Sequence, residues 1–88
     1  MKTFIIFTED KNRTEIEKIL SSRLEGFTLL FGQGFWVGAG ITYHENSLVI
    51  MVLTKEEEVI RDIAREIKRV NQQESILVTS FKTKGEMI

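Results

Sequence analysis

The chain has 88 residues, of which 42% are hydrophobic and 28% charged, a composition ordinary for a globular protein and wrong for a disordered one. Twelve Lys and Arg residues against thirteen Asp and Glu residues give a net charge of −1, which argues against general nucleic-acid binding. With no Cys and a single His, the sequence excludes a disulfide framework, a thiol nucleophile and a His-rich metal cluster.

The N-terminal part predicts a strand followed by a helix. Residues 3–8 are apolar at nearly every position, which is typical of a strand covered on both faces. Asn12 is a favourable N-cap, with Glu15 three residues later as its capping-box partner. Apolar residues at helical spacing follow: Ile16, Ile19, Leu20 and Leu24. We expect Gly26 to end this helix as its C′ glycine.

Next comes a glycine-rich aromatic segment, residues 27–41. Four of its residues are glycines at even positions: Gly32, Gly34, Gly38 and Gly40. Inside a β-like run they indicate a bent or bulged strand, or a loop pressed closely against another group. The spacing fits neither the dinucleotide fingerprint nor the phosphate-binding P-loop, and the segment leads into a strand instead of a helix. We expect the polar residues 42–46 to form the turn.

The C-terminal half repeats the alternation of strand and helix. Six successive apolar residues, 48–53, predict the central strand. Thr54 is expected to cap a second helix, with Glu57 three residues later. The buried stripe of this helix is predicted to be Val59, Ile60, Ile63, Ala64, Ile67 and Val70. Residues 74–81 predict the last clear strand.

The order β-α-β-β-α-β predicts an α+β, ferredoxin-like fold: an antiparallel four-stranded sheet with two helices on one face. We interpret residues 1–88 as one domain. No apolar stretch approaches the roughly 20 residues of a membrane span, and no cleavage-site pattern follows the N-terminal run, so we expect a cytoplasmic protein without a membrane partner. RNA recognition on such a sheet needs exposed aromatic residues, and strand 48–53 has none.

Both faces of the predicted sheet are apolar, although two helices cover only one of them. In residues 3–7 and 48–53 both alternating sets of side chains are hydrophobic. The face without helices would be a large exposed apolar patch, which monomers rarely tolerate. We therefore predict a homo-oligomer formed through the helix-free face; which of the two sets lies on that face is left open.

The candidate site lies in and after the glycine-rich segment. Trp36 can stack on a flat ring, and Gln33 and Gly34 are candidates for backbone contact with a ligand. Tyr43 and Glu45, with His44 between them, form an ionisable cluster at the head of the central strand, where one carboxylate can attract a cation. The alternative is a plain hairpin whose glycines relieve crowding and whose charges are solvated. No metal site is expected.

The element order, the doubly apolar sheet and the glycine-aromatic hairpin resemble PII-like proteins. The resemblance implies a trimer with the sheets facing inward and small ligands bound in the clefts between subunits. Residues 52–78 are similar to phage-encoded S-adenosylmethionine lyases, formerly called hydrolases. The similar positions are Lys55, Ile63-Ala64-Arg65 and Gln73-Glu74-Ser75-Ile76-Leu77-Val78.

This resemblance implies a reaction without metal or cofactor. In those lyases the substrate's carboxylate attacks its own γ carbon, giving homoserine lactone and methylthioadenosine. The implied catalytic residue is Glu45, and the implied substrate-binding aromatic residue is Trp36 or Tyr43. Two other functions fit the sequence: a non-catalytic PII-like trimer that binds an adenine-containing small molecule, and a small phage-type interaction or inhibitor protein.

Overall fold

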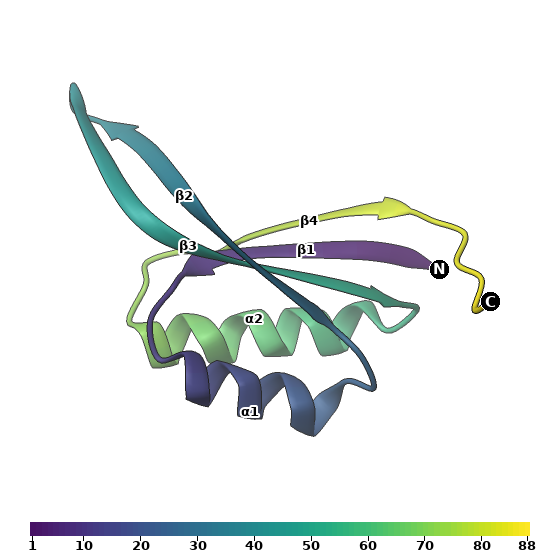
Figure 1. Cartoon of the computed structure of the whole chain (residues 1–88). Coiled ribbons are helices and arrows are strands. Elements are labelled where there is room, and N and C mark those ends of the chain that lie inside the picture. The colour runs from purple at the N-terminus through teal and green to yellow at the C-terminus, as the bar shows by residue number, and fades with distance from the viewer.

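The computed structural model describes residues 1–88, and its elements follow the expected order. They are β1 (Lys2–Glu9), α1 (Arg13–Arg23), β2 (Thr28–Gly38), β3 (Ile41–Thr54), α2 (Glu57–Asn71) and β4 (Leu77–Lys82). All strand pairs are antiparallel, in the order β2-β3-β1-β4 across the sheet. Both helices lie on one side of this sheet (Figure 1). The predicted ferredoxin-like α+β fold is confirmed.

The hydrophobic core lies between the sheet and the two helices. In the register, Phe4 and Ile6 of β1 lie opposite Val52 and Ile50 of β3, and all four side chains are buried. The helices contribute buried residues from their predicted stripes: Ile16, Ile19, Leu20, Ile60, Ile63, Ala64 and Ile67. Burial of each large aliphatic side chain favours folding by about 1.5–3 kcal/mol. Neither helix is both long and apolar enough to cross a membrane.

The helix ends differ from the expected caps. Asn12 does precede α1, but it has φ 56° and forms no capping hydrogen bond, so the predicted capping box is wrong. Thr54 is the last residue of β3, and its hydroxyl accepts a hydrogen bond from the Glu56 backbone N–H (3.1 Å) one residue before α2 begins. Gly26 does not have the positive φ of a C′ glycine. α1 already ends at Arg23, because Leu24 is extended.

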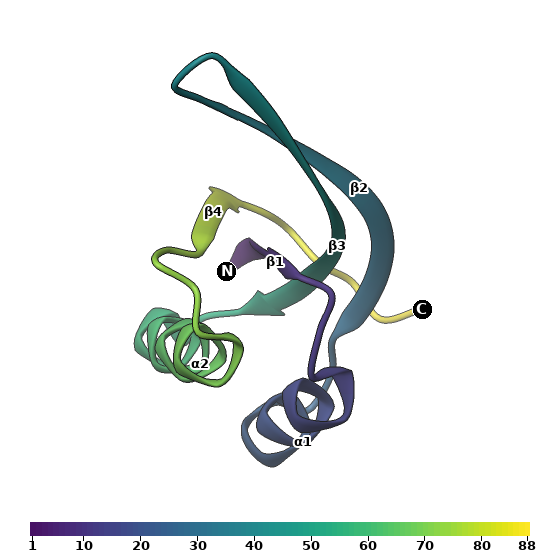
Figure 2. The same ribbon diagram turned by 90° about the vertical axis from the view of Figure 1, so that its left-hand side faces the viewer.

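The hairpin of β2 and β3 is longer and more regular than expected. Thr28 to Gly38 pair without interruption with Met51 to Ile41, so there is no bulge in the strand pairing. The chain turns through Ala39 and Gly40, whose φ angles of 50° and 78° are those of the tight turns that favour hairpins. Residues 42–46, expected to form the turn, belong to β3. The hairpin extends beyond the sheet and curves to the side opposite the helices (Figures 1 and 2).

The structure shows which apolar set is left uncovered. Val49, Met51 and Leu53 of β3 lie opposite Phe7, Ile5 and Thr3 of β1, on the side without helices, which we call the open face. Other large side chains of the open face are about half exposed: Leu30, Leu77 and Phe81. The open face thus carries apolar side chains on all four strands, and at its Thr3–Leu53 end the C-terminal residues Thr83 and Gly85 lie against it.

Candidate functional site

A pocket of about 360 Å³ lies where the open face meets the loop between α2 and β4. One wall comes from the sheet and the hairpin, and the other from the loop residues 72–75. The side chains that line it on the sheet side are Phe7, Glu9, Trp36, Glu45 and Leu77. The end of β1, the middle of the hairpin and the start of β4 therefore meet at one place.

Trp36 and Glu45 meet because of the hairpin register. Gly34 pairs with Glu45 and Trp36 pairs with Tyr43, so all four residues are on the open face. A Cβ atom placed on Gly34 would lie 3.3 Å from Trp36 Nε1 and 3.3 Å from Glu45 Cγ. The indole and the Glu45 side chain therefore both lie against Gly34, where the absence of a Cβ leaves room for them.

Of the other predicted residues, Tyr43 and Gln33 lie outside the pocket. Tyr43 is the cross-strand partner of Trp36, but it does not line the pocket, and 56% of its surface is exposed. Gln33 pairs with Asn46, which places it on the opposite side of the hairpin. His44 is on that side too, with its ring stacked on Phe35 at 4.8 Å between centroids. The pocket therefore brings together Trp36 and Glu45, with Gly34 beneath them.

The charged side chains of the pocket are all carboxylates. Glu9, Glu45 and Glu74 line it, and no Lys or Arg does. Glu9 forms an ion pair with Lys11 (3.4 Å), whereas Glu45 and Glu74 form none. No group of acidic and His side chains in the chain is arranged to hold a metal ion. The pocket suits an organic cation beside an aromatic face, and it is poorly suited to a polyphosphate.

Neither a protein-family model nor a curated protein matches this sequence, but solved structures match its fold. A phage SAM lyase in complex with S-methyl-5′-thioadenosine matches with a TM-score of 0.74 and 17% identity, over 92% of this chain and 80% of the lyase. The periplasmic divalent cation tolerance protein CutA from Archaeoglobus fulgidus also has a TM-score of 0.74, at 15% identity over 99% of this chain and 88% of CutA. The B. subtilis GlnK–ATP complex reaches 0.67, at 18% identity over 91% and 80%. This chain has the PII-like fold.

The PII-like fold alone does not select a function, because it occurs here in a lyase, a cation tolerance protein and an ATP-binding protein. The function must therefore be inferred from the chemistry of the pocket.

The loop wall of the pocket, residues 72–75, was not predicted from the sequence, which shows only a polar break after α2 at this point.

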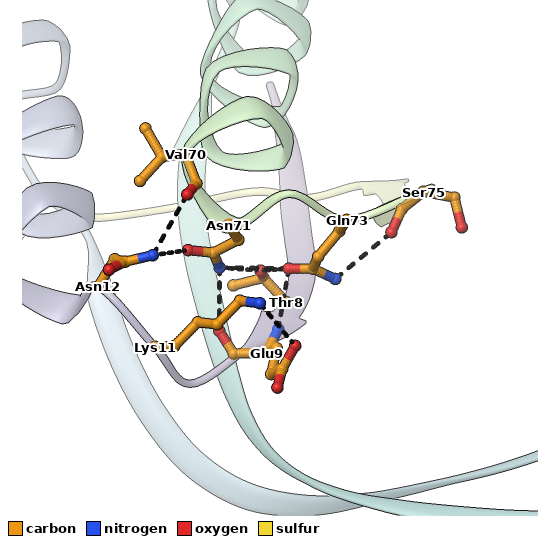
Figure 3. Close-up of polar contacts among 8 residues, drawn as sticks. All are labelled: Thr8, Glu9, Lys11, Asn12, Val70, Asn71, Gln73 and Ser75. Carbon is orange, nitrogen blue, oxygen red and sulfur yellow. Dashed lines mark hydrogen bonds and ion pairs between the residues drawn. The ribbon is translucent and has the colours of Figure 1, made fainter.

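A buried amide holds that loop wall in place. Asn71, 1% exposed, points its Nδ2 at Thr8 Oγ1 (3.0 Å), the Glu9 carbonyl oxygen (3.2 Å) and Gln73 Oε1 (3.2 Å) (Figure 3). Its Oδ1 accepts a hydrogen bond from Asn12 Nδ2 (3.1 Å). The end of α2, the end of β1 and the start of α1 are thereby joined. The sequence does indicate that Asn71 is buried, because position 71 lies four residues after Ile67 and therefore on the same, buried helix face.

We expect Asn71→Ala to lower the free energy of unfolding by about 2–4 kcal/mol, because it leaves several partners of one buried network unpaired. Asn46→Ala removes the same amide from an exposed strand position and should cost less than about 0.5 kcal/mol. Urea denaturation followed by circular dichroism measures both. Equal stability of the two variants would contradict the structural role of Asn71.

Proposed function

We propose that this chain is an S-adenosylmethionine lyase, which cleaves its substrate intramolecularly to homoserine lactone and methylthioadenosine. The observation that carries the proposal is the pocket itself, where an indole and a carboxylate meet and every charged lining residue is acidic. S-adenosylmethionine is a sulfonium cation with a flat adenine ring, so it matches both features. The fold likeness to a phage SAM lyase bound to S-methyl-5′-thioadenosine supports the same reading.

The proposed reaction is a balanced internal displacement. One oxygen of the substrate carboxylate bonds to the γ carbon while the bond from that carbon to sulfur breaks. Sulfur keeps the electron pair and becomes the neutral thioether of methylthioadenosine, and the rest closes as homoserine lactone. No water is consumed and no proton has to be transferred, so the reaction needs no residue acting as a general acid or base.

In this mechanism the protein supplies position and environment. Glu45 holds the sulfonium and Trp36 covers the adenosyl part of the substrate. Together they orient the γ carbon toward the substrate's own carboxylate, and such orientation contributes much of the rate of an internal displacement. Positive sulfur and negative carboxylate lose their charges as they react. Apolar walls such as Phe7 and Leu77 favour that loss of charge, because they solvate the separated charges poorly.

The working form is proposed to be a homotrimer packed through the open face. The support is the half-exposed apolar surface over four strands, including Leu30, Leu77 and Phe81, which a monomer would leave in water. The pocket lies at the margin of this face, so a neighbouring subunit would close it from solvent. The number of copies, three, follows from the resemblance to PII-like proteins.

The proposal is tested by incubating the purified protein with S-adenosylmethionine and following methylthioadenosine and homoserine lactone by chromatography. We expect both products in equal amounts. S-adenosylhomocysteine, whose sulfur is an uncharged thioether, is the matched control and should not react. No product at stoichiometric protein would contradict the lyase; calorimetric binding of the substrate without product would then favour the non-catalytic ligand-binding alternative.

A further inference from the structure

The hairpin of β2 and β3 carries one wall of the pocket away from the body of the chain. β1 pairs with β3 only as far as Ser47, so from Asn46 to the turn β3 pairs with β2 alone. This part of the hairpin projects beyond the rest of the sheet (Figure 1). Trp36 and Glu45 belong to it, whereas the other residues that line the pocket belong to the body. The shape of the pocket therefore depends on the angle at which the hairpin leaves the sheet.

A cluster of side chains holds the hairpin at the point where it leaves the sheet. The Asp10 carboxylate accepts two hydrogen bonds from Arg13, one from Nε (3.2 Å) and one from Nη2 (2.6 Å). The Cζ atom of this guanidinium lies over the Phe31 ring, 4.3 Å from its centroid. The backbone N–H of Asp10 also donates to the Asn46 carbonyl oxygen (2.8 Å). The start of α1 is thereby joined to both strands of the hairpin; we call Asp10, Arg13 and Phe31 the Arg13 clamp.

The clamp depends on the shape of the arginine side chain. A planar guanidinium can donate two hydrogen bonds along its edge to a carboxylate while its face lies on an aromatic ring. The carboxylate of the clamp is also shielded from solvent, since the Asp10 side chain is only 16% exposed. The ion pair between Arg65 and Asp62 on α2 has side chains 67% and 51% exposed, so water screens it more strongly.

The clamp lies across the sheet from the pocket. The open-face residues of β2 are the even-numbered ones such as Trp36, so the Phe31 side chain is on the face toward the helices. Neither Asp10 nor Arg13 lines the pocket. However, the backbone at Asn46, which Asp10 holds, is directly next to Glu45. A loosened clamp would therefore shift Glu45 and Trp36 together without removing a contact to a ligand.

We infer that the Arg13 clamp sets the position of the hairpin against the loop wall of the pocket, and that Arg13 is a positioning residue for turnover. The part about turnover rests on the proposed function, because it assumes that Trp36 and Glu45 orient a substrate. The part about the hairpin does not. A reacting group misplaced by about 1 Å can cost about 100-fold in rate, so a residue that never touches the substrate can affect turnover.

The position of the hairpin can be measured without any substrate. Trp36 is the only tryptophan, so the decay of its fluorescence anisotropy reports the motion of the hairpin wall. We expect Arg13→Ala to raise the amplitude of nanosecond depolarisation about two- to threefold, the difference between a rigid and a flexible segment. Arg65→Ala is the matched control, because it also removes an arginine that pairs with an aspartate three residues earlier (3.0 Å), but on α2. It should leave the decay unchanged, and circular dichroism verifies that both variants are folded.

Phe31 supplies a conservative variant for the same measurement. Phe31→Tyr keeps the ring face and should behave like the wild type, whereas Phe31→Leu removes it and should loosen Trp36 as Arg13→Ala does. Because both substitutions break one contact, the double variant Arg13→Ala/Phe31→Leu should show no more depolarisation than either single variant. Additive effects, or an unchanged Trp36 decay in Arg13→Ala, would overturn the clamp.

Turnover of S-adenosylmethionine tests the second part of the inference. We expect Arg13→Ala to lower kcat about 10-fold and to change KM less than about threefold, because orientation is lost but no ligand contact is removed. Phe31→Tyr should keep the wild-type kcat. A loosened Trp36 with an unchanged kcat would overturn the role of Arg13 in turnover. No turnover by the wild type would overturn the proposed function, and the Trp36 decay would still decide whether the clamp holds the hairpin.

Discussion

Glu45→Gln is expected to lower kcat/KM for S-adenosylmethionine by about 100-fold. The substitution keeps the size of the side chain but removes the negative charge that holds the sulfonium, and a misplaced reacting carbon costs rate on this scale. Methylthioadenosine is neutral, and the amide oxygen of Gln still accepts a hydrogen bond. Its affinity should therefore stay within about threefold of the wild type.

Glu74→Gln is the matched control for this prediction. Glu74 also lines the pocket, but it comes from the loop after α2 and not from the hairpin that carries Trp36 and Glu45. If the general negative potential of the pocket were all that mattered, both variants would lose activity equally. We expect Glu74→Gln to lose only a few-fold in kcat/KM, because substrate orientation depends on Glu45. Full activity in Glu45→Gln would contradict the role of Glu45 as the cation partner.

The order of elements was predictable because a helix or strand that buries one face repeats its apolar residues at a characteristic spacing. The residues predicted for the α2 stripe recur at helical spacing, and Ile60, Ile63 and Ile67 are fully buried. The six-residue apolar run 48–53 likewise marked the strand that lies between two others in the sheet. In these segments the apolar residues are the buried ones, so the sequence pattern indicates the place of each residue in the fold.

The hairpin register was not predictable for the opposite reason. Gly32, Gly34 and Gly38 share the open face with Trp36, and glycines carry no information about which face is buried. The Ala39-Gly40 turn lacks the Asn or Asp that usually marks such a turn, whereas the polar stretch 42–46 imitates one. Without the register, Trp36 and Tyr43 could not be separated as candidates for the pocket.

Met51→Lys is expected to dissociate the oligomer while leaving the chain folded. Met51 lies on the open face, opposite Ile5 and Thr28, so a lysine there places a charge in the proposed interface but outside the core of the chain. Ile50→Lys is the matched contrast one position earlier. Ile50 is fully buried beneath the helices, and a charge there should cost about 4 kcal/mol or more and unfold the chain.

Light scattering and circular dichroism together separate these outcomes. The wild type should be an oligomer at micromolar concentration, Met51→Lys a folded monomer and Ile50→Lys largely unfolded. A folded monomeric wild type would contradict the assembly. The turnover of each variant then tests whether catalysis depends on the oligomer. If monomeric Met51→Lys still formed methylthioadenosine at the wild-type rate, Trp36 and Glu45 would need no neighbouring subunit. We expect turnover to be lost, because a pocket open along the apolar face leaves the reacting charges solvated.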